Sequence, residues 1–357
     1  MKKNFDKFTV IIPEHNRPEH LKRLLSYYLS FGVKVIVADS SDKELSYISE
    51  YKNKIEYVHT PRKPLAEKIH EISNLIRTPY VFMCANDDFV IPDTVNKIVD
   101  FLDKNPLYNS GQGIYFDFSY KNDHIEKSLL YSHIIGKDLS EDCACKRVLN
   151  LMSNYFQYYY CVYRTDIFQQ TYQSVINKDG KALIHNLNLL ELYISIYPLI
   201  DGNHIVLSSL YAARESILGS ASSYVDNIGE VISQKKYHLE YQNFMVLLST
   251  HLSQKENIAY INAQRIIERA IITYMDNSLP KYFSFKLPKY FSIKSRFLRA
   301  VKAGLKKINL FKNTRIVIKI KKRTFIQDDS FVFSLQDLDN WEKIQEFIMQ
   351  YAYIYKF

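Results

Sequence analysis

The chain has 357 residues, of which 47% are apolar, and it carries 47 lysines and arginines against 38 acidic residues, a formal net charge of +9. This composition, with only 9 glycines and 10 prolines, is that of a globular protein and excludes a fibrous or low-complexity chain. The sequence has no run of 18 apolar residues, so it predicts no membrane-spanning helix. Its four cysteines favour a reducing compartment over a disulfide-bonded secreted fold.

Short apolar runs alternate with segments of helical spacing in the first quarter of the chain. The runs that predict strands are residues 8–12, 33–38, 55–59 and 80–84. The segments that predict helices are residues 19–29, 43–51 and 65–76. Strands that alternate with helices of about ten residues are typical of βαβ units. The sequence therefore predicts an α/β fold with a mostly parallel sheet flanked by helices.

The same two patterns continue along the rest of the chain. Helices are predicted at residues 93–104, 146–152, 185–200, 225–275 and 341–355, and strands at residues 114–119, 205–211 and 315–325. The aromatic run at residues 155–163 predicts a buried strand, with a surface on which sugars stack as the alternative.

Polar residues follow the predicted strands of the first quarter. They are Glu14 and Asn16 after the first strand, Asp39 and Ser40 after the second, and Asn86, Asp87 and Asp88 after the fourth. Right-handed crossovers bring the carboxyl ends of parallel strands to one edge, where ligands bind. Two adjacent carboxylates there favour a divalent cation, Mg²⁺ or Mn²⁺, which usually accompanies a phosphate-bearing substrate. The alternative is a polar turn in which both aspartates cap the next helix.

A single glutamate interrupts the apolar helix predicted at residues 185–200. The helix has one polar stripe, formed by His185, Asn188, Glu191 and Ser195. Burial would raise the pKa of Glu191 toward the value that a general base needs, which makes it a candidate catalytic base. A structural ion pair with Arg214 is the alternative, and Asp201 is a second candidate base. Arg214 itself could neutralise a leaving diphosphate or form an ordinary salt bridge.

The positive charge is concentrated near the C-terminal end. Residues 281–325 contain 15 lysines and arginines and no acidic residue, and residues 279–294 hold the near-repeat LPKYFSFK–LPKYFSIK. Residues 293–308 have apolar residues on one helical face and basic residues on the other, which is typical of a helix lying in a membrane interface. A solvated basic face packed on the body is one alternative, and nucleic-acid binding is another.

Three stretches carry a resemblance to a known family: IIPEHNRPEHLKRLL from residue 11, VIVADSSD from residue 35, and KPLAEKIHEISNLIRTPYVFMCANDDFVIPDTV from residue 63. They resemble the nucleotide-binding half of a glycosyltransferase family 2 enzyme with the GT-A fold. The resemblance covers about the first 110 residues well. This chain has Ala38-Asp39-Ser40-Ser41 where the family usually has two acidic residues, Gly and Ser, and Asn86 precedes the two aspartates.

The resemblance implies transfer of a sugar from a nucleotide-sugar donor, of the UDP type, to an acceptor hydroxyl with inversion. It implies that Asp88, with Asp87, binds Mg²⁺ or Mn²⁺, and that Glu191 is the catalytic base. We expect Arg214 to be the second catalytic residue, through its charge on the leaving diphosphate. The implied donor-binding residues are Pro13, Glu14, Asn16, Arg17, Asp39, Ser40, Lys68, Asn86 and Asp87. We expect a glycan or lipid-linked glycan of a bacterial surface polysaccharide as acceptor. A nucleotidyltransferase and a non-catalytic polysaccharide-assembly protein are the alternatives.

These expectations lead to a predicted domain organisation and a predicted cellular location. Residues 1–222 are predicted to form the GT-A-like domain, divided into a nucleotide-binding half (1–110) and an acceptor half (111–222). A helical region (223–278) and a basic amphipathic C-terminal region (279–357) follow. We expect a cytoplasmic protein, peripheral on the inner face of the cell membrane through residues 279–325, that binds no nucleic acid.

Overall fold

The computed structural model describes residues 5–121, 123–216, 226, 228–278 and 334–355. All of them belong to one compact unit, which comprises residues 1–281 and 333–357. The basic segment, with its near-repeat, its predicted helix and its predicted strand, lies outside the described residues. None of the described helices is both long enough and apolar enough to cross a membrane.

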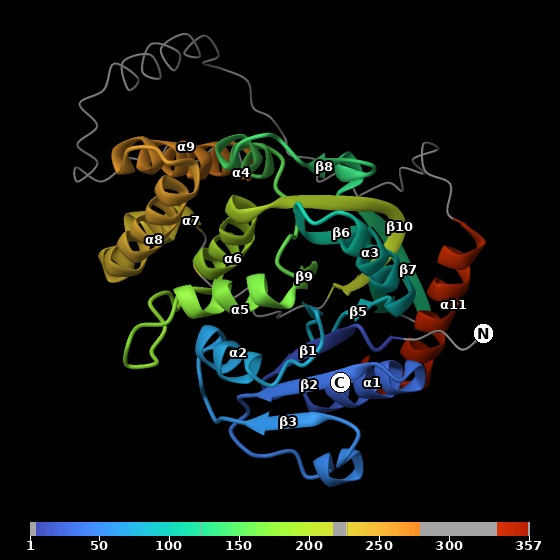
Figure 1. The fold of residues 1–357 in the computed structure, drawn as a ribbon. Helices are drawn as coiled ribbons and strands as arrows, with labels where there is room; N and C mark the ends of the chain where they lie inside the picture. The colour runs from blue at the N-terminus through green and yellow to red at the C-terminus, as the bar shows by residue number, and fades with distance from the viewer. Residues whose placement is uncertain (1–4, 122, 217–225, 227, 279–333, 356–357) are drawn as a thin grey trace, which may run out of the picture. The chain divides into compact units, whose positions relative to one another are not determined.

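One mixed sheet forms the centre of this unit, with strand order β3-β2-β1-β4-β9-β6-β10-β5 (Figure 1). In this order the strands are Glu56–His59, Lys34–Asp39, Phe8–Glu14, Tyr80–Met83, Val162–Arg164, Tyr108–Lys121, Asn203–Glu215 and Phe89–Val90. Strand β7 (His124–Leu130) pairs with β6, and β8 (Asp138–Leu139) pairs with β10. The pairs among β1 to β4, and the pair of β6 with β10, are parallel, whereas β9 and β5 run antiparallel to their neighbours. The predicted α/β, mostly parallel architecture is confirmed.

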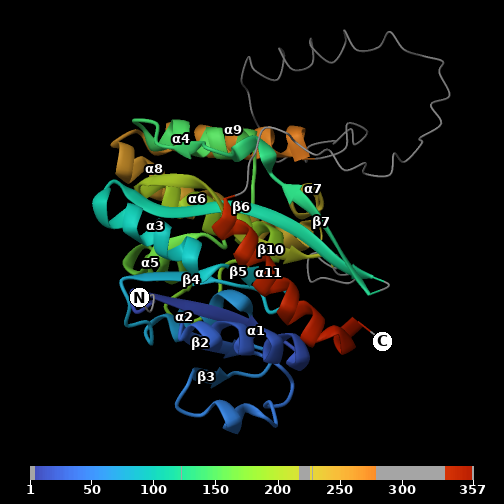
Figure 2. The same cartoon turned by 90° about the vertical axis from the view of Figure 1, so that its right-hand side faces the viewer.

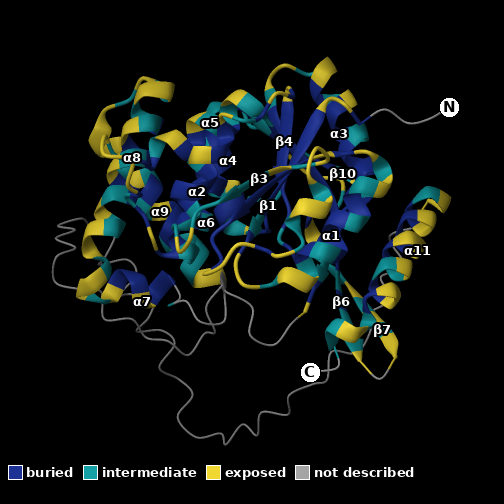
Figure 3. Ribbon diagram, turned by 90° about the horizontal axis from the view of Figure 1, so that it is seen from below, coloured by how far each residue is buried: buried dark blue, intermediate teal, exposed yellow. Residues whose placement is uncertain are grey.

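Helices cover the sheet, and Figure 3 shows the strands β1 and β4 buried at the centre with exposed residues on the outer sides of α8 and α11. The helices are α1 (Pro18–Phe31), α2 (Leu65–Ser73), α3 (Pro92–Lys104), α4 (Ala144–Ser153), α5 (Thr165–Ser174), α6 (Leu187–Asp201), α7 (Ile228–Ser233), α8 (His238–Glu256), α9 (Tyr260–Ser278) and α11 (Leu335–Gln350). Strand β1 forms because Val10, Ile11 and Ile12 are fully buried between them.

Strand β1 continues past Pro13, where the sequence predicted its end. Pro13 pairs in register with Ala38 of β2, and the register with β4 ends at Ile11. Beyond Ile11 the β4 side of the strand is therefore an edge, where the missing N–H of proline breaks no ladder hydrogen bond. The extension places Glu14 inside the sheet edge rather than in a loop.

Two other predicted elements are wrong. Residues 43–51 form only the short 3₁₀ helix Ile48–Tyr51, in which the i, i+3 spacing places Ile48 and Tyr51 together against the core. The aromatic run at residues 155–163 is largely irregular, and only Val162–Arg164 pairs as a strand.

The closing helix α11 packs on the body of the protein (Figure 2). Trp341 contacts the rings of Phe116 and Phe118 on β6, with ring centroids 5.7 and 6.4 Å apart. Asp337 forms a capping box with Ser334 and accepts a hydrogen bond from the backbone N–H of Leu210 at 2.9 Å. Residues 334–355 therefore belong to the same compact unit as the sheet.

Candidate active site

Glu14 joins the ends of three neighbouring strands. Its carbonyl oxygen accepts hydrogen bonds from the backbone N–H of Ser40 (3.0 Å) and from Nζ of Lys68 (2.7 Å). Its carboxylate accepts from Nδ2 of Asn86 (2.6 Å) and from the backbone N–H of Arg17 (2.5 Å). Burial raises the pKa of Glu14, and the hydrogen bonds from Asn86 and Arg17 oppose this rise. The carboxyl ends of β1, β2 and β4 are thus held together.

Asp39 and Ser40 lie at the end of β2, as the sequence predicted. Asp39 is fully buried and accepts hydrogen bonds from the backbone N–H of Ser41 (2.7 Å) and from the hydroxyl of Tyr57 (2.5 Å). A carboxylate offers about four acceptor positions, so Asp39 retains acceptor capacity for a nucleobase. Lys68 also donates to Oγ of Ser40, and burial lowers the pKa of this lysine to about 8.

An open hollow of about 540 Å³ lies beside this edge. It is lined by Asn16, by Pro18 and Glu19 at the start of α1, and by residues 41–47 after β2. Asn16 has a left-handed backbone (φ 55°), its N–H donates to Oγ of Ser41, and its Oδ1 accepts from the N–H of Asp42. The volume falls in the range of small-molecule sites, roughly 300–1,000 Å³.

The two aspartates after β4 have different surroundings. Asp87 pairs with Arg17, the N-cap residue of α1, through Nη1 and Oδ2 at 2.5 Å. Asp88 is buried and accepts a hydrogen bond from the backbone N–H of Glu215 at 2.9 Å. Burial and the neighbouring Asp87 raise the pKa of Asp88 well above its usual value, while the backbone hydrogen bond from Glu215 and the charge of Arg214 lower it. The net effect of these surroundings is to disfavour the ionised form of Asp88.

A divalent cation fits this donor set. Asp87 and Asp88 supply hard carboxylate oxygens at the end of a central strand, which are the ligands that Mg²⁺ and Mn²⁺ prefer. A cation would stabilise the ionised form of Asp88, which burial and Asp87 disfavour.

Glu191 and Arg214 come from α6 and β10, beyond the nucleotide-binding strands. Glu191, on the second turn of α6, is half-buried and accepts a hydrogen bond from the hydroxyl of Tyr155 at 2.7 Å. Burial raises the pKa of Glu191, whereas this hydrogen bond and the charge of Arg214 lower it. Arg214, near the end of β10, also interacts with Asp88. Arg214 therefore links the predicted base to the predicted metal ligand electrostatically, although no direct Glu191–Arg214 ion pair forms among the described residues.

The second candidate base lies elsewhere. Asp201 is ten residues after Glu191 on α6, about 15 Å away along a helix that rises 1.5 Å per residue. Its carboxylate contacts His251 at 3.0 Å and Lys255 at 3.9 Å, both on α8. Asp201 thus has the partners of a structural ion pair between two helices.

A buried ion pair that sequence reasoning missed lies behind the acidic motif. Arg23 of α1 and Glu215 of β10 are fully buried and lie 2.6 Å apart. The same guanidinium donates to the backbone carbonyl of Asp87 at 2.9 Å and to the hydroxyl of Tyr355. The one available signal was that Arg23 stands between apolar positions of its helix, next to the core residue Leu24.

Comparison with known proteins gives a family match that includes this edge of the sheet. The sequence model of the family described as "Glycosyl transferase family 2" matches residues 9–178. This stretch of the chain is similar to glycosyltransferase family 2. The matched residues run from β1 to just past α5 and include the acidic motif, while Glu191 and Arg214 lie beyond them. The predicted resemblance, fold class and enzyme class are confirmed, so the chain is a glycosyltransferase similar to family 2, with the GT-A fold.

Solved structures with a similar chain trace are known. The structure titled "Crystal structure of S. aureus TarS 1-349" is 13% identical, with 82% of this chain and 77% of that chain covered and a TM-score of 0.49. Its complex with UDP is 14% identical, with 83% and 78% covered and a TM-score of 0.49. The comparison with curated proteins gave no match. The similarity to family 2 rests on the sequence match over residues 9–178, not on these structures.

Proposed function

We propose that this enzyme transfers a sugar from a UDP-type nucleotide-sugar donor to an acceptor hydroxyl with inversion of the anomeric centre. The observation that supports this is that the charge of Arg214 acts on both Asp88 and Glu191. A metal-binding carboxylate, a cation for the leaving group and a base are the groups that this reaction requires.

The donor side contains several positive charges. Arg17, Lys68 and Arg214 come from the N-cap of α1, from α2 and from β10. Asp88 and Asp87 would hold Mg²⁺ or Mn²⁺, and the cation would supply positive charge to the leaving diphosphate. Arg214 adds a fixed guanidinium on the same side, which stabilises developing negative charge without reorganisation.

Glu191 is the proposed base. Its raised pKa makes it a better proton acceptor than an exposed glutamate. The hydroxyl of Tyr155 fixes one carboxylate oxygen at 2.7 Å, so the second oxygen is available to an acceptor hydroxyl. Removal of that proton as the acceptor oxygen attacks would complete a single displacement, and the nucleoside diphosphate leaves from the opposite face.

We extend the proposal to the acceptor and the location. A glycan or lipid-linked glycan of a bacterial surface polysaccharide is the proposed acceptor, and residues 279–325 are proposed to hold the cytoplasmic enzyme on the inner face of the membrane. The support is the composition of that segment, with 15 basic residues and no acidic residue between positions 281 and 325.

Two variants test the catalytic proposal. Glu191→Gln should lower kcat by about a hundredfold or more and leave donor affinity unchanged, because it removes only the proton acceptor. Asp88→Asn should abolish transfer and weaken the binding of Mn²⁺. Turnover of UDP-sugars is followed by UDP release with a mixed glycan acceptor pool. Wild-type turnover in either folded variant would overturn the assigned role.

A further inference from the structure

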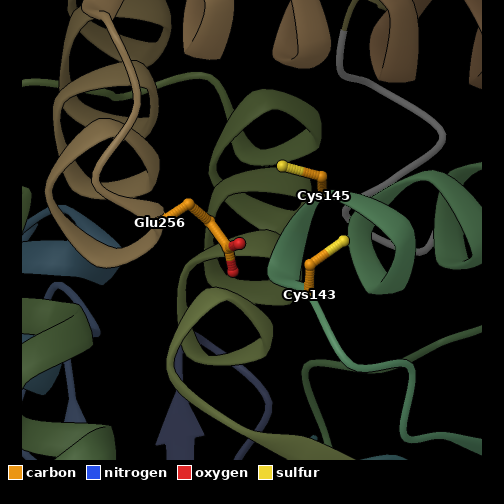
Figure 4. A group of neighbouring side chains, drawn as sticks. All are labelled: Cys143, Cys145 and Glu256. Carbon is orange, nitrogen blue, oxygen red and sulfur yellow. The ribbon is translucent and has the colours of Figure 1, made fainter.

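A second group of metal-ligating side chains lies among the helices, outside the proposed donor site. It comprises Cys143, Cys145 and Glu256, which we call the thiol cluster. Each residue is half-buried and offers one ligand atom, and these atoms all lie within 4.8 Å of one another. Cys143 and Cys145 stand at the start of α4, and Glu256 is the last residue of α8 (Figure 4).

The carboxylate of Glu256 is fixed in this cluster. Its Oε1 accepts a hydrogen bond at 2.6 Å from the backbone N–H of Ala144, which stands between the two cysteines. This N–H belongs to the first turn of α4 and has no partner within the helix. The contact therefore orients Glu256 toward the thiols across the junction of two helices that are far apart in sequence.

The two thiols come from one short stretch. Cys143 is the N-cap residue of α4, and Cys145 follows after a single residue. Burial raises the pKa of the Cys145 thiol to about 11, and the adjacent Cys143 and Glu256 act in the same direction. A dithiol beside a carboxylate keeps its protons unless a cation replaces them.

We propose that the thiol cluster binds one thiophilic divalent cation of the Zn²⁺ class, with solvent in the fourth position. Two thiolates and a carboxylate are ligands of the kind that zinc accepts, and a tetrahedral ion with Zn–S bonds of about 2.3 Å holds its sulfurs a little under 4 Å apart. The spacing of the ligand atoms in the cluster is close to that requirement. Binding would release two thiol protons to solvent.

The cation would tie α4 to the end of α8. Arg147 of α4 donates hydrogen bonds to the carbonyls of Leu199 and Ile200 at the end of α6, at 3.0 and 3.1 Å. Helix α6 carries Glu191 about two turns earlier. A bound cation would therefore stabilise the helical layer that supports the proposed base, without taking part in the reaction.

Metal titration of the full chain tests this proposal. The protein is stripped with a chelator, kept reduced and titrated with Cd²⁺, whose thiolate complexes absorb in the ultraviolet, and with Zn²⁺. We expect one equivalent of Cd²⁺ with a two-thiolate absorption band, and a rise in Tm on Zn²⁺ binding. Cys145→Ser and Cys143→Ala should each weaken binding at least tenfold, and Glu256→Gln should weaken it without removing the band.

Control variants make the outcome decisive. Glu126→Gln, an exposed carboxylate on the β6–β7 hairpin, should bind Cd²⁺ like the wild type. Asp88→Asn should also keep the thiolate band, which separates this site from the donor-site metal. The proposal is overturned by a band of unchanged intensity in both folded cysteine variants, or by the absence of any thiolate band in the reduced wild type.

Discussion

The buried pair of Arg23 and Glu215 gives the sharpest prediction for Arg23→Met. Methionine is of similar length, so the change removes the charge and its hydrogen bonds with little loss of volume. It leaves the carboxylate of Glu215, whose side chain is 1% exposed, without its cation. Removing one partner of a buried ion pair costs about 3–5 kcal/mol, a large part of the 5–15 kcal/mol that stabilises a typical domain.

The single tryptophan provides the assay. Trp341 packs on Phe116 and Phe118, so its fluorescence reports unfolding of the sheet in urea. Arg23→Met should lower the free energy of unfolding by about 3–5 kcal/mol. The control is Lys7→Met, which breaks the exposed pair with Asp103 and should cost about 1 kcal/mol or less. A loss of under about 1 kcal/mol for Arg23→Met would refute the reasoning.

A double variant separates stability from positioning. Arg23→Met combined with Glu215→Met replaces the pair by apolar side chains, which often restores stability. Activity should remain low in the double variant, because the guanidinium that held the carbonyl of Asp87 is still absent. Recovery of both stability and activity would show that Arg23 acts only through the fold.

Four further results are expected. The apparent pKa on the acidic side of the kcat/KM pH profile should lie above the usual glutamate value of 4.5, since Glu191 must be ionised and its pKa is raised. Tyr155→Phe should raise this apparent pKa further, because it removes a hydrogen bond that lowers the pKa of Glu191. EDTA should abolish transfer, and Mn²⁺ or Mg²⁺ should restore it in the wild type but not in Asp88→Asn. Tyr355→Phe should weaken metal-dependent activity several-fold with little change in unfolding free energy, because it removes only one of the three hydrogen-bond partners of the Arg23 side chain. Replacing Lys302, Lys306 and Lys307 by Ala should weaken binding to anionic liposomes roughly a hundredfold at low salt, at about 1 kcal/mol per charge, and equal binding would argue against the membrane proposal.

Local sequence patterns were sufficient to predict which residues lie at this edge of the sheet. Each strand is an apolar run that ends in polar residues, and the handedness of βαβ units brings those ends to one edge. Glu14, Asp39 and Asp88 could therefore be placed at this edge from the amino-acid sequence alone. The helix expected at residues 43–51 is only one 3₁₀ turn, whose Ile48 and Tyr51 pack against the core, and a local apolar pattern does not distinguish such a turn from a longer helix.

The buried contacts of Arg23 with Glu215 and Tyr355 could not be predicted in this way. Arg23 and Glu215 are 192 positions apart, and Arg23 and Tyr355 are 332 apart. The apolar periodicity around these residues does not predict such contacts, since they depend on how β10 and the C-terminal residues reach α1 in three dimensions. A charged residue between apolar helix positions is the one local sign, and it indicates a buried partner without identifying it.

The C-terminal residues belong to the catalytic body, and this changes how the basic segment must be studied. Asp337 completes the hydrogen bonding of β10 at Leu210, and Tyr355 reaches the arginine that holds the acidic motif. Residues 279–333 therefore lie in sequence between two parts of one compact unit, α9 on one side and α11 on the other. A chain cut before residue 279 would lose Trp341 from the core together with the basic segment, so a loss of membrane binding in it would have two causes. Substitutions within the segment leave α11 in the chain and isolate the contribution of its charges.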